Sequence, residues 1–324
     1  MNNRRSFIKN VSLLSAGGLL VGNTGFAHAI SHSADTKIAA PKALGLQIYS
    51  LQNELFNDLP KRMKELKKMG YFHLELAGYN EGKIGQVDML EFKKMADDAG
   101  LEIVSSHTNP AFKSLSGMEQ FFPRYKKELL PEAQEYWKAA AADHAKIGCK
   151  YLVQPMMPVI DSHDDAAIVC EFLNEAGKIC KEAGIIFGYH NHNFEFKRVV
   201  KPEDANRTAM PWMPQGDQIM DLFIAGTDPS LVTFELDVYW AVRGGNDPLD
   251  YLKNHSKRFT LIHIKDTAVL GQSGLLNFEN IFNRMYANGV QYYFVELEKM
   301  PDGRTQFEGI KDCAGYLQKA AFVR

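Results

Sequence analysis

Cysteine, positive charge and long apolar segments are all in short supply in this sequence. Only four of the 324 residues are cysteines and none forms a C-x-x-C motif, so a disulfide framework is excluded. Lysine and arginine total 37 against 39 acidic residues, and a nucleic-acid partner, which normally needs a basic face, is therefore not expected. The apolar run Val11–Phe26 is too short and too rich in glycine for stable membrane insertion.

The first 29 residues differ from the rest of the chain. The segment Asn3-Arg4-Arg5-Ser6-Phe7-Ile8-Lys9 is a twin-arginine pattern, and Ala27-His28-Ala29 supplies a small-x-small cleavage signature after the apolar run. We expect residues 1–29 to be a twin-arginine signal peptide, residues 30–42 a linker, and the mature protein periplasmic. A disordered tail or a membrane anchor is the alternative interpretation.

Short apolar runs recur at a steady spacing through the remaining sequence. Each run has four to eight residues and is rich in Ile, Val, Leu, Phe or Tyr, as a buried parallel strand should be. The candidate strands are Leu44–Tyr49, Phe72–Leu76, Leu101–Ser106, Tyr151–Gln154, Ile185–Tyr189, Leu231–Asp237, Phe259–Ile264 and Tyr292–Leu297.

Amphipathic helical stretches lie between these runs, and several end in a glycine that suits a short turn into the next strand. The clearest stretches are Leu59–Met69, Met89–Ala99, Ala133–Ile147, Ala166–Ala183 and Phe278–Asn288. Eight strand-helix units without a break in composition predict a (β/α)₈ TIM barrel, class α/β, as a single domain over residues 43–324. A doubly wound open sheet is the alternative, but no G-x-G-x-x-G follows the first strand.

Acidic and imidazole side chains follow the last four predicted strands. In a barrel the carboxyl ends of the strands meet at one mouth, so these groups become neighbours. Buried carboxylates are costly without a partner, and a divalent cation would supply one. Oxygen ligands with one nitrogen suit Mn²⁺, Mg²⁺ or Co²⁺ better than Zn²⁺, and we favour Mn²⁺. The selected side chains are Glu195, Asp237, His263 and Glu296.

Each of these residues also has an ordinary structural explanation. Glu195 could cap a loop insertion, and Asp237 could cap the helix that follows its strand. His263 could be a satisfied core histidine, and Glu296 could alternate between core and solvent. These four separate explanations would all have to be true at the matching ends of successive strands. One metal site explains all four residues at once, so we favour it.

The sequence resembles the sugar phosphate isomerase/epimerase family of xylose isomerase-like barrels, which includes ketose 3-epimerases and inosose dehydratases. The resemblance covers nearly the whole mature chain. The motifs that carry it are Gly45-Leu46-Gln47-Ile48-Tyr49-Ser50-Leu51, Phe72-His73-Leu74-Glu75-Leu76, Ser105-Ser106-His107, Gly188-Tyr189-His190-Asn191-His192-Asn193-Phe194-Glu195-Phe196, Leu236-Asp237-Val238-Tyr239-Trp240, Ile262-His263-Ile264-Lys265-Asp266 and Phe294-Val295-Glu296.

The resemblance implies one divalent metal, with the family's ligands falling on Glu195, Asp237, His263 and Glu296. It further implies that the metal polarises a sugar carbonyl and that Glu195 and Glu296 exchange a proton on the neighbouring carbon through an enediolate. Homodimers are common among relatives, so a homodimer is one expectation here. Candidate substrate-binding residues, for which packing is the alternative role, are His107, His190, His192 and Lys265, and Trp240 and Arg243 are further candidates for stacking on or pairing with the substrate.

Two other functions compete with an isomerase or epimerase of a keto-sugar. A lyase or dehydratase would use the same metal and base to expel a group from a 3-keto-glycoside or an inosose. Export favours glycosides over sugar phosphates, and the only weak candidate for a phosphate-binding loop is Gly271-Gln272-Ser273-Gly274. A non-catalytic sugar-binding protein is the second alternative, although it would tolerate loss of a glutamate from the pair and neither is lost.

Overall fold

The computed structural model describes residues 42–201, 203, 215–298, 300–301 and 303–324. The predicted signal peptide at residues 1–29, and the predicted linker up to residue 41, lie outside these residues. Within the described part of the chain, no helix combines the length and the apolar character that crossing a membrane requires.

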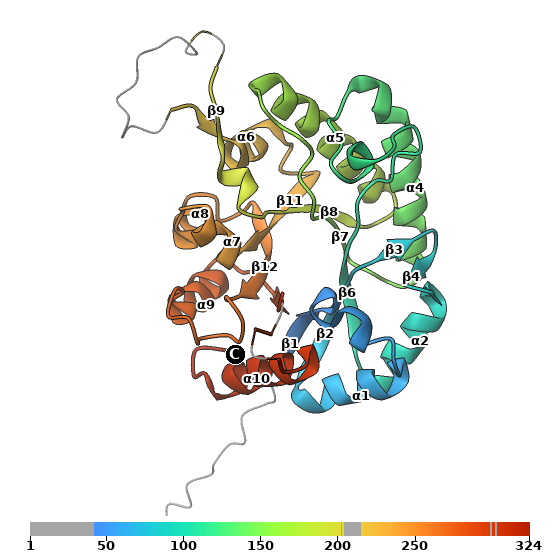
Figure 1. Cartoon of the computed structure of the whole chain (residues 1–324), viewed down its shortest axis with the longest axis vertical. Coiled ribbons are helices and arrows are strands. Elements are labelled where there is room, and N and C mark those ends of the chain that lie inside the picture. The colour runs from blue at the N-terminus through green and yellow to red at the C-terminus, as the bar shows by residue number, and fades with distance from the viewer. Residues whose placement is uncertain (1–41, 202, 204–214, 299, 302) are drawn as a thin grey trace, which may run out of the picture. The chain divides into compact units, whose positions relative to one another are not determined.

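Eight parallel strands close into a barrel, as the sequence predicts. Around the barrel the order is β1-β13-β12-β11-β8-β7-β6-β2, and Figure 1 shows helices outside the ring. Strand β1 pairs with both β2 and β13, which closes the sheet. The strands are β1 (Leu44–Gln47), β2 (Tyr71–Leu76), β6 (Glu102–His107), β7 (Tyr151–Gln154), β8 (Ile186–His190), β11 (Val232–Asp237), β12 (Phe259–Lys265) and β13 (Tyr292–Glu296).

Local sequence signals mark both ends of α1. Asp58 accepts a hydrogen bond from the backbone N–H of Lys61 at the start of α1, and Gly70 ends that helix with a φ of 101°. The α-helices are α1 (Leu59–Met69), α2 (Met89–Ala99), α3 (Met118–Phe121), α4 (Leu130–Lys146), α5 (His163–Glu182), α6 (Ile219–Gly226), α7 (Val238–Arg243), α8 (Pro248–Asn254), α9 (Phe278–Ala287) and α10 (Gln306–Lys319).

Smaller elements follow the strand ends and shape the mouth of the barrel. The first predicted strand was two residues too long, because Ile48 begins a 3₁₀ helix and the side chain of Gln47 accepts a hydrogen bond from the N–H of Tyr49. These elements are η1 (Ile48–Glu54), β3 (Tyr79–Asn80), β4 (Lys83–Ile84), β5 (Val87–Asp88), η2 (Lys127–Leu129), η3 (Phe194–Phe196), β9 (Arg198–Val199) and β10 (Asp217–Gln218).

The interior of the barrel contains an apolar plug and a polar layer. Val104, Val153, Leu261 and Phe294 form a buried cluster separate from the main core. They come from β6, β7, β12 and β13, which lie on opposite sides of the ring, so they can meet only inside it. Fully buried polar side chains from the same strands and their neighbours form the layer that leads to the mouth: Gln47, Glu75, Ser105, His190, Glu235, His263 and Lys265.

Candidate metal centre at the barrel mouth

Strand register brings the charged side chains of β8, β11, β12 and β13 to one level. His190 is paired with Glu235, Asp237 with His263, and Lys265 with Glu296. These residues are all at most 7% exposed. The strand ends therefore gather carboxylates, imidazoles and one ammonium group in a buried cluster.

One set of four side chains, here called the outer group, offers ligand atoms that all lie within 4.8 Å of one another. It consists of His190, Asp237, His263 and Glu296. Nδ1 of His263 lies 3.2 Å from Oε2 of Glu296 and 4.0 Å from Oδ2 of Asp237. Three of the four residues predicted as ligands are thus brought together, and His190 is the fourth member of the group.

The two carboxylate oxygens of Asp237 have different surroundings. Oδ1 accepts a hydrogen bond of 2.8 Å from the N–H of Trp240 and so caps α7. Oδ2 is buried and has no hydrogen-bond partner among the described residues. A buried carboxylate oxygen without a partner is costly, and a cation in the outer group would compensate it. The two roles considered for Asp237, helix cap and metal ligand, are therefore compatible, because each involves a different oxygen. The outer group fits a divalent cation.

The two carboxyl groups of the outer group have pKa values shifted in opposite directions. Burial raises the pKa of Asp237 to about 7, although Lys265 opposes the shift. Burial also acts to raise the pKa of Glu296, but the ammonium of Lys265 and the imidazole of His263 outweigh it and hold that pKa well below its usual range. Glu296 is therefore the carboxylate that stays ionised most readily.

Glu195 is buried on η3 and lies outside the outer group. One oxygen accepts a 2.7 Å hydrogen bond from the hydroxyl of Tyr189, and the other accepts a 2.8 Å bond from the N–H of His192. Burial raises its pKa to about 7. Its role as a metal ligand stays a prediction, and the geometry favours His190, the last residue of β8.

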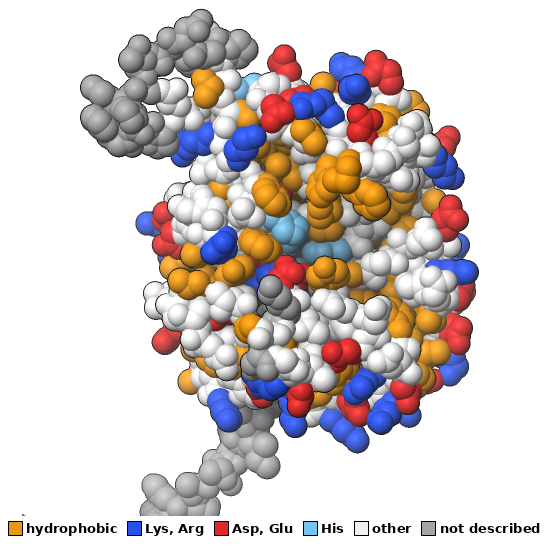
Figure 2. Space-filling view, viewed as in Figure 1, with side chains coloured by type: hydrophobic (Ala, Val, Ile, Leu, Met, Phe, Trp, Pro, Cys, Tyr) orange, Lys and Arg blue, Asp and Glu red, His pale blue; other side chains and the backbone are white. Residues whose placement is uncertain are grey.

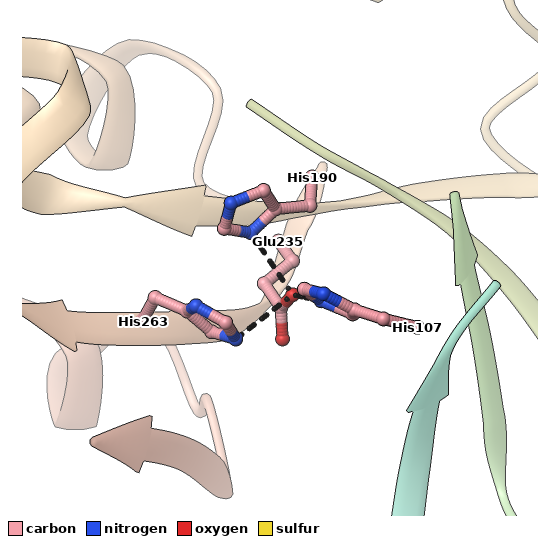
Figure 3. A group of neighbouring side chains, drawn as sticks. All are labelled: His107, His190, Glu235 and His263. Atoms are coloured by element: carbon pink, nitrogen blue, oxygen red, sulfur yellow. Dashed lines mark hydrogen bonds and ion pairs between the residues drawn. The ribbon is translucent and has the colours of Figure 1, made fainter. Parts of the chain in front are cut away.

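In a second set, the inner group, Glu235 was missed by the sequence analysis, and the other three members were given separate roles. Its members are His107, His190, Glu235 and His263, which Figure 3 shows converging from separate strands. Oε2 of Glu235 lies 2.7 Å from Nε2 of His107, 3.2 Å from Nδ1 of His190 and 3.2 Å from Nε2 of His263. The signal for Glu235 was its position two residues before Asp237 on one strand, which places both side chains on the same face.

Glu75, at the end of β2, extends the inner group across the barrel. Its Oε2 lies 2.5 Å from Nε2 of His263 and 3.3 Å from Nε2 of His107. Gln47 donates a 2.8 Å hydrogen bond to the same oxygen. Glu75 stood within a motif that carried the resemblance, but it had no predicted role.

The six predicted substrate-binding residues do not all lie at one place. His107, His190 and His192 line a pocket of about 290 Å³ at the mouth, together with Glu296. Trp240 lies beside it, with its ring 5.6 Å from that of His192 and 4.9 Å from Nζ of Lys265. Arg243, in contrast, is exposed at the end of α7 and is outside both groups and outside the described lining of this pocket.

The pocket combines a polar floor with an apolar rim. Figure 2 shows histidine side chains in a depression on this face, with hydrophobic side chains around it. The rim includes Tyr49 and Met156, which are 51% and 37% exposed. Burial lowers the pKa of His192 to about 4, so its imidazole is neutral at pH 7. Such a site suits a small polar ligand with hydroxyl groups.

Comparison with known proteins identifies relatives over most of the chain. The sequence model of the xylose isomerase-like TIM barrel family matches residues 63–319. Two crystal structures from Parabacteroides distasonis ATCC 8503, each described as a sugar phosphate isomerase/epimerase, are 56% and 47% identical. The matches cover 87% and 89% of this chain and all of the other chain, with TM-scores of 0.83 and 0.82.

More distant relatives are also found. The inosose dehydratase of Geobacillus kaustophilus (strain HTA426) is 22% identical over 222 residues, which are 63% of this chain and 60% of the relative. The chain thus spans about 60% of the length of this curated relative. The D-psicose 3-epimerase of Clostridium cellulolyticum H10 is 14% identical, over 87% of this chain and 99% of the other, with a TM-score of 0.62, and shares the fold.

Proposed function

This chain belongs to the xylose isomerase-like TIM barrel family, and we propose that it is a divalent-metal-dependent isomerase or epimerase of a keto-sugar. The observation that carries the proposal is the buried Oδ2 of Asp237, which has no hydrogen-bond partner among the described residues and lies 4.0 Å from Nδ1 of His263. A cation held by the outer group would compensate this oxygen at the floor of a pocket of sugar-like size.

A divalent cation at this position would polarise a carbonyl oxygen and make the neighbouring C–H more acidic. His190, Asp237, His263 and Glu296 would hold it, which is a set of two nitrogens and two carboxylates. Mg²⁺ prefers oxygen ligands, whereas Mn²⁺, Co²⁺ and Zn²⁺ accept imidazole more readily. We therefore keep Mn²⁺ as the favoured ion, with Co²⁺ and Zn²⁺ ahead of Mg²⁺.

The chain's own side chains would move the proton. Glu296 lines the pocket and is kept ionised by Lys265, so it can accept a proton from the substrate carbon. Glu195 has a pKa of about 7, a value suited to donating or accepting a proton at neutral pH. Its hydrogen bond to the N–H of His192 ties it to a residue of the pocket lining. Glu195 and Glu296 remain the proposed acid–base pair.

The neutral imidazole of His192 and the indole of Trp240 would position the sugar. Nε1 of Trp240 is buried without a described hydrogen-bond partner, so it can donate to a substrate oxygen. His192 can donate or accept one hydrogen bond, because its lowered pKa keeps it uncharged. These contacts would orient the carbon that loses the proton.

A lyase is the second candidate, and the similarity to inosose dehydratases favours it. Here the same carboxylate would take the proton next to the carbonyl, and a hydroxyl or an alkoxyl group would leave from the adjacent carbon. The substrate would be an inosose or a 3-keto-glycoside. The product would then lack water or an alcohol, whereas an isomer keeps the mass of the substrate.

The decisive experiment incubates purified protein with keto-sugars, inososes and 3-keto-glycosides in deuterated water, with and without Mn²⁺. An isomerase or epimerase is expected to give a product of altered stereochemistry that carries one deuteron at carbon. Loss of water or of an aglycone would assign the lyase instead. A protein loaded with metal, as measured by elemental analysis, that turned over none of these compounds would contradict both functions.

We also propose that the protein reaches the periplasm through the twin-arginine pathway, on the pattern at Arg4 and Arg5. Cell fractionation of the full-length protein tests this. The double substitution Arg4→Lys and Arg5→Lys should retain the protein in the cytoplasm with its leader uncleaved. Periplasmic recovery of that variant in wild-type amount would contradict the proposal.

A further inference from the structure

Two imidazoles of the outer group each contact a buried carboxylate through their second ring nitrogen. Nδ1 of His263 faces Glu296 and Asp237, while its Nε2 lies 2.5 Å from Glu75 and 3.2 Å from Glu235. Nδ1 of His190 lies 3.2 Å from Glu235, which leaves Nε2 for the outer group. The two histidines therefore lie between the candidate ion site of the outer group and the carboxylates of Glu75 and Glu235.

Oε2 of Glu75 accepts hydrogen bonds in these contacts, and Oε2 of Glu235, which faces nitrogens of three imidazoles, can donate to at most one of them. Gln47 fixes this for Glu75, because the amide oxygen of Gln47 accepts the N–H of Tyr49 and its NH₂ group is thereby turned toward Glu75. An ionised carboxylate that already accepts one N–H accepts others in the same way. The nitrogen that faces it must carry the proton, and the opposite ring nitrogen of a neutral imidazole keeps its lone pair.

We propose, resting on the metal site of the proposed function, that Glu75 and Glu235 are positioning residues that fix the tautomers of His190 and His263. Glu75 holds the Nε2 proton of His263, so Nδ1 is its metal-binding atom. Glu235 holds the Nδ1 proton of His190, so Nε2 is its metal-binding atom. Orienting carboxylates of this kind increase the basicity of a ligating imidazole and remove the cost of fixing its ring.

The same geometry argues against a cation in the inner group itself. Oε2 of Glu235 lies at hydrogen-bonding distance from nitrogens of three imidazoles, and it occupies the point on which they converge (Figure 3). A metal ion would have to take that point, with ligand distances of about 2.0–2.2 Å. The inner group is therefore a network of imidazole donors around one carboxylate acceptor. It holds His190 and His263, which also belong to the outer group, in position.

Metal affinity tests the proposal in the full-length protein. Glu75→Gln and Glu235→Gln should each weaken Mn²⁺ and Zn²⁺ binding about 10–100-fold in calorimetric titrations. Glu102→Gln is the matched control, because Glu102 also faces an imidazole, that of His73 at 3.5 Å, but at the start of its strand. The control should bind both ions with wild-type affinity.

A measurement on the wild-type protein covers the case in which a variant fails to fold. In the Zn²⁺-loaded protein labelled with ¹⁵N-histidine, long-range proton–nitrogen spectra should show His263 bound through Nδ1 and His190 through Nε2. The reversed tautomers, or unchanged affinity in both glutamine variants, would overturn the inference and leave the metal site standing. Absence of any metal binding by the wild type would overturn the proposed function and the inference together.

Discussion

Nζ of Lys265 lies 3.0 Å from Oε2 of Glu296, and both side chains are buried at the barrel mouth. Lys265 also contacts Oε1 of Glu298 at 2.5 Å and lies over the ring of Trp240. A buried ammonium is costly unless it is paired, so this lysine depends on its carboxylates as much as Glu296 depends on it. Loss of either charged group is therefore expected to lower the free energy of unfolding.

Replacing Lys265 with Met should therefore destabilise the protein by about 3–5 kcal/mol, because the carboxylate of Glu296 stays buried and loses its ammonium partner. Urea unfolding followed by circular dichroism measures the change. Lys150→Met is the control, since Lys150 forms its 2.9 Å pair with Glu102 in a partly exposed position, and it should cost about 1 kcal/mol or less. Equal losses in the two variants would contradict a special role for the buried pair.

Glu296→Gln and Glu195→Gln should each lower turnover by about 10²–10⁴-fold, the usual contribution of a general acid or base. Steady-state kinetics on the substrate found by the product screen gives the numbers. Circular dichroism should show the same fold in both variants, because glutamine keeps the shape of the side chain. Wild-type turnover in either variant would remove that glutamate from the acid–base pair.

Removing metal should inactivate the protein, and adding Mn²⁺ should restore it. Because an ion that binds only the folded state stabilises it, Mn²⁺ at 100 times its Kd should add about 2.7 kcal/mol to the free energy of unfolding. Asp237→Asn, which weakens the ligand set, should abolish that increment. Thermal unfolding with and without Mn²⁺ checks this, and an increment that persisted in Asp237→Asn would place the ion elsewhere.

His144, which belongs to neither the inner nor the outer group, should make the folded state sensitive to acid. Its side chain is fully buried on α4, and burial lowers its pKa from 6.5 to about 4. Between these values the unfolded chain binds a proton that the folded chain does not, so this residue removes stability as the pH falls from about 6.5 toward 4.

The expected loss from His144 between pH 7 and pH 5 is about 2 kcal/mol. Urea unfolding at both pH values measures it. In His144→Gln the pH dependence should shrink by that amount, whatever the variant's stability at pH 7. The same slope in variant and wild type would show that His144 does not titrate in this way.

Closure of the barrel leaves no room for a side chain at Gly45. A Cβ atom added there would lie 1.9 Å from the carbonyl oxygen of Tyr293 on the paired strand β13. Gly45→Ala should therefore destabilise the fold by about 3 kcal/mol or more. Gly315→Ala, on α10 with nothing within 4 Å, should instead stabilise it by about 0.5–1 kcal/mol. Chemical denaturation of both variants tests the contrast, and equal effects would contradict it.

Sequence patterns were most informative where the structure is local. The bounds predicted for α1 and α2 are those observed, because the period of apolar residues and the glycine stops are properties of short segments. Asp237, His263 and Glu296 come together as predicted, since the carboxyl ends of parallel strands must meet at one mouth. Glu195 is outside the outer group, because it lies five residues beyond the end of β8, and its role as a ligand stays a prediction.

The sequence by itself determined that this chain forms a barrel and which strand ends carry charge, because both follow from the periodicity of neighbouring residues. Only the tertiary structure decided that His190 joins the outer group and that Glu75 and Glu235 lie beneath it. Contacts such as that of Glu75 with His263 cross the barrel between strands that share no hydrogen bonds, here β2 and β12. Their distances depend on the stagger of the closed sheet, and no local pattern encodes it.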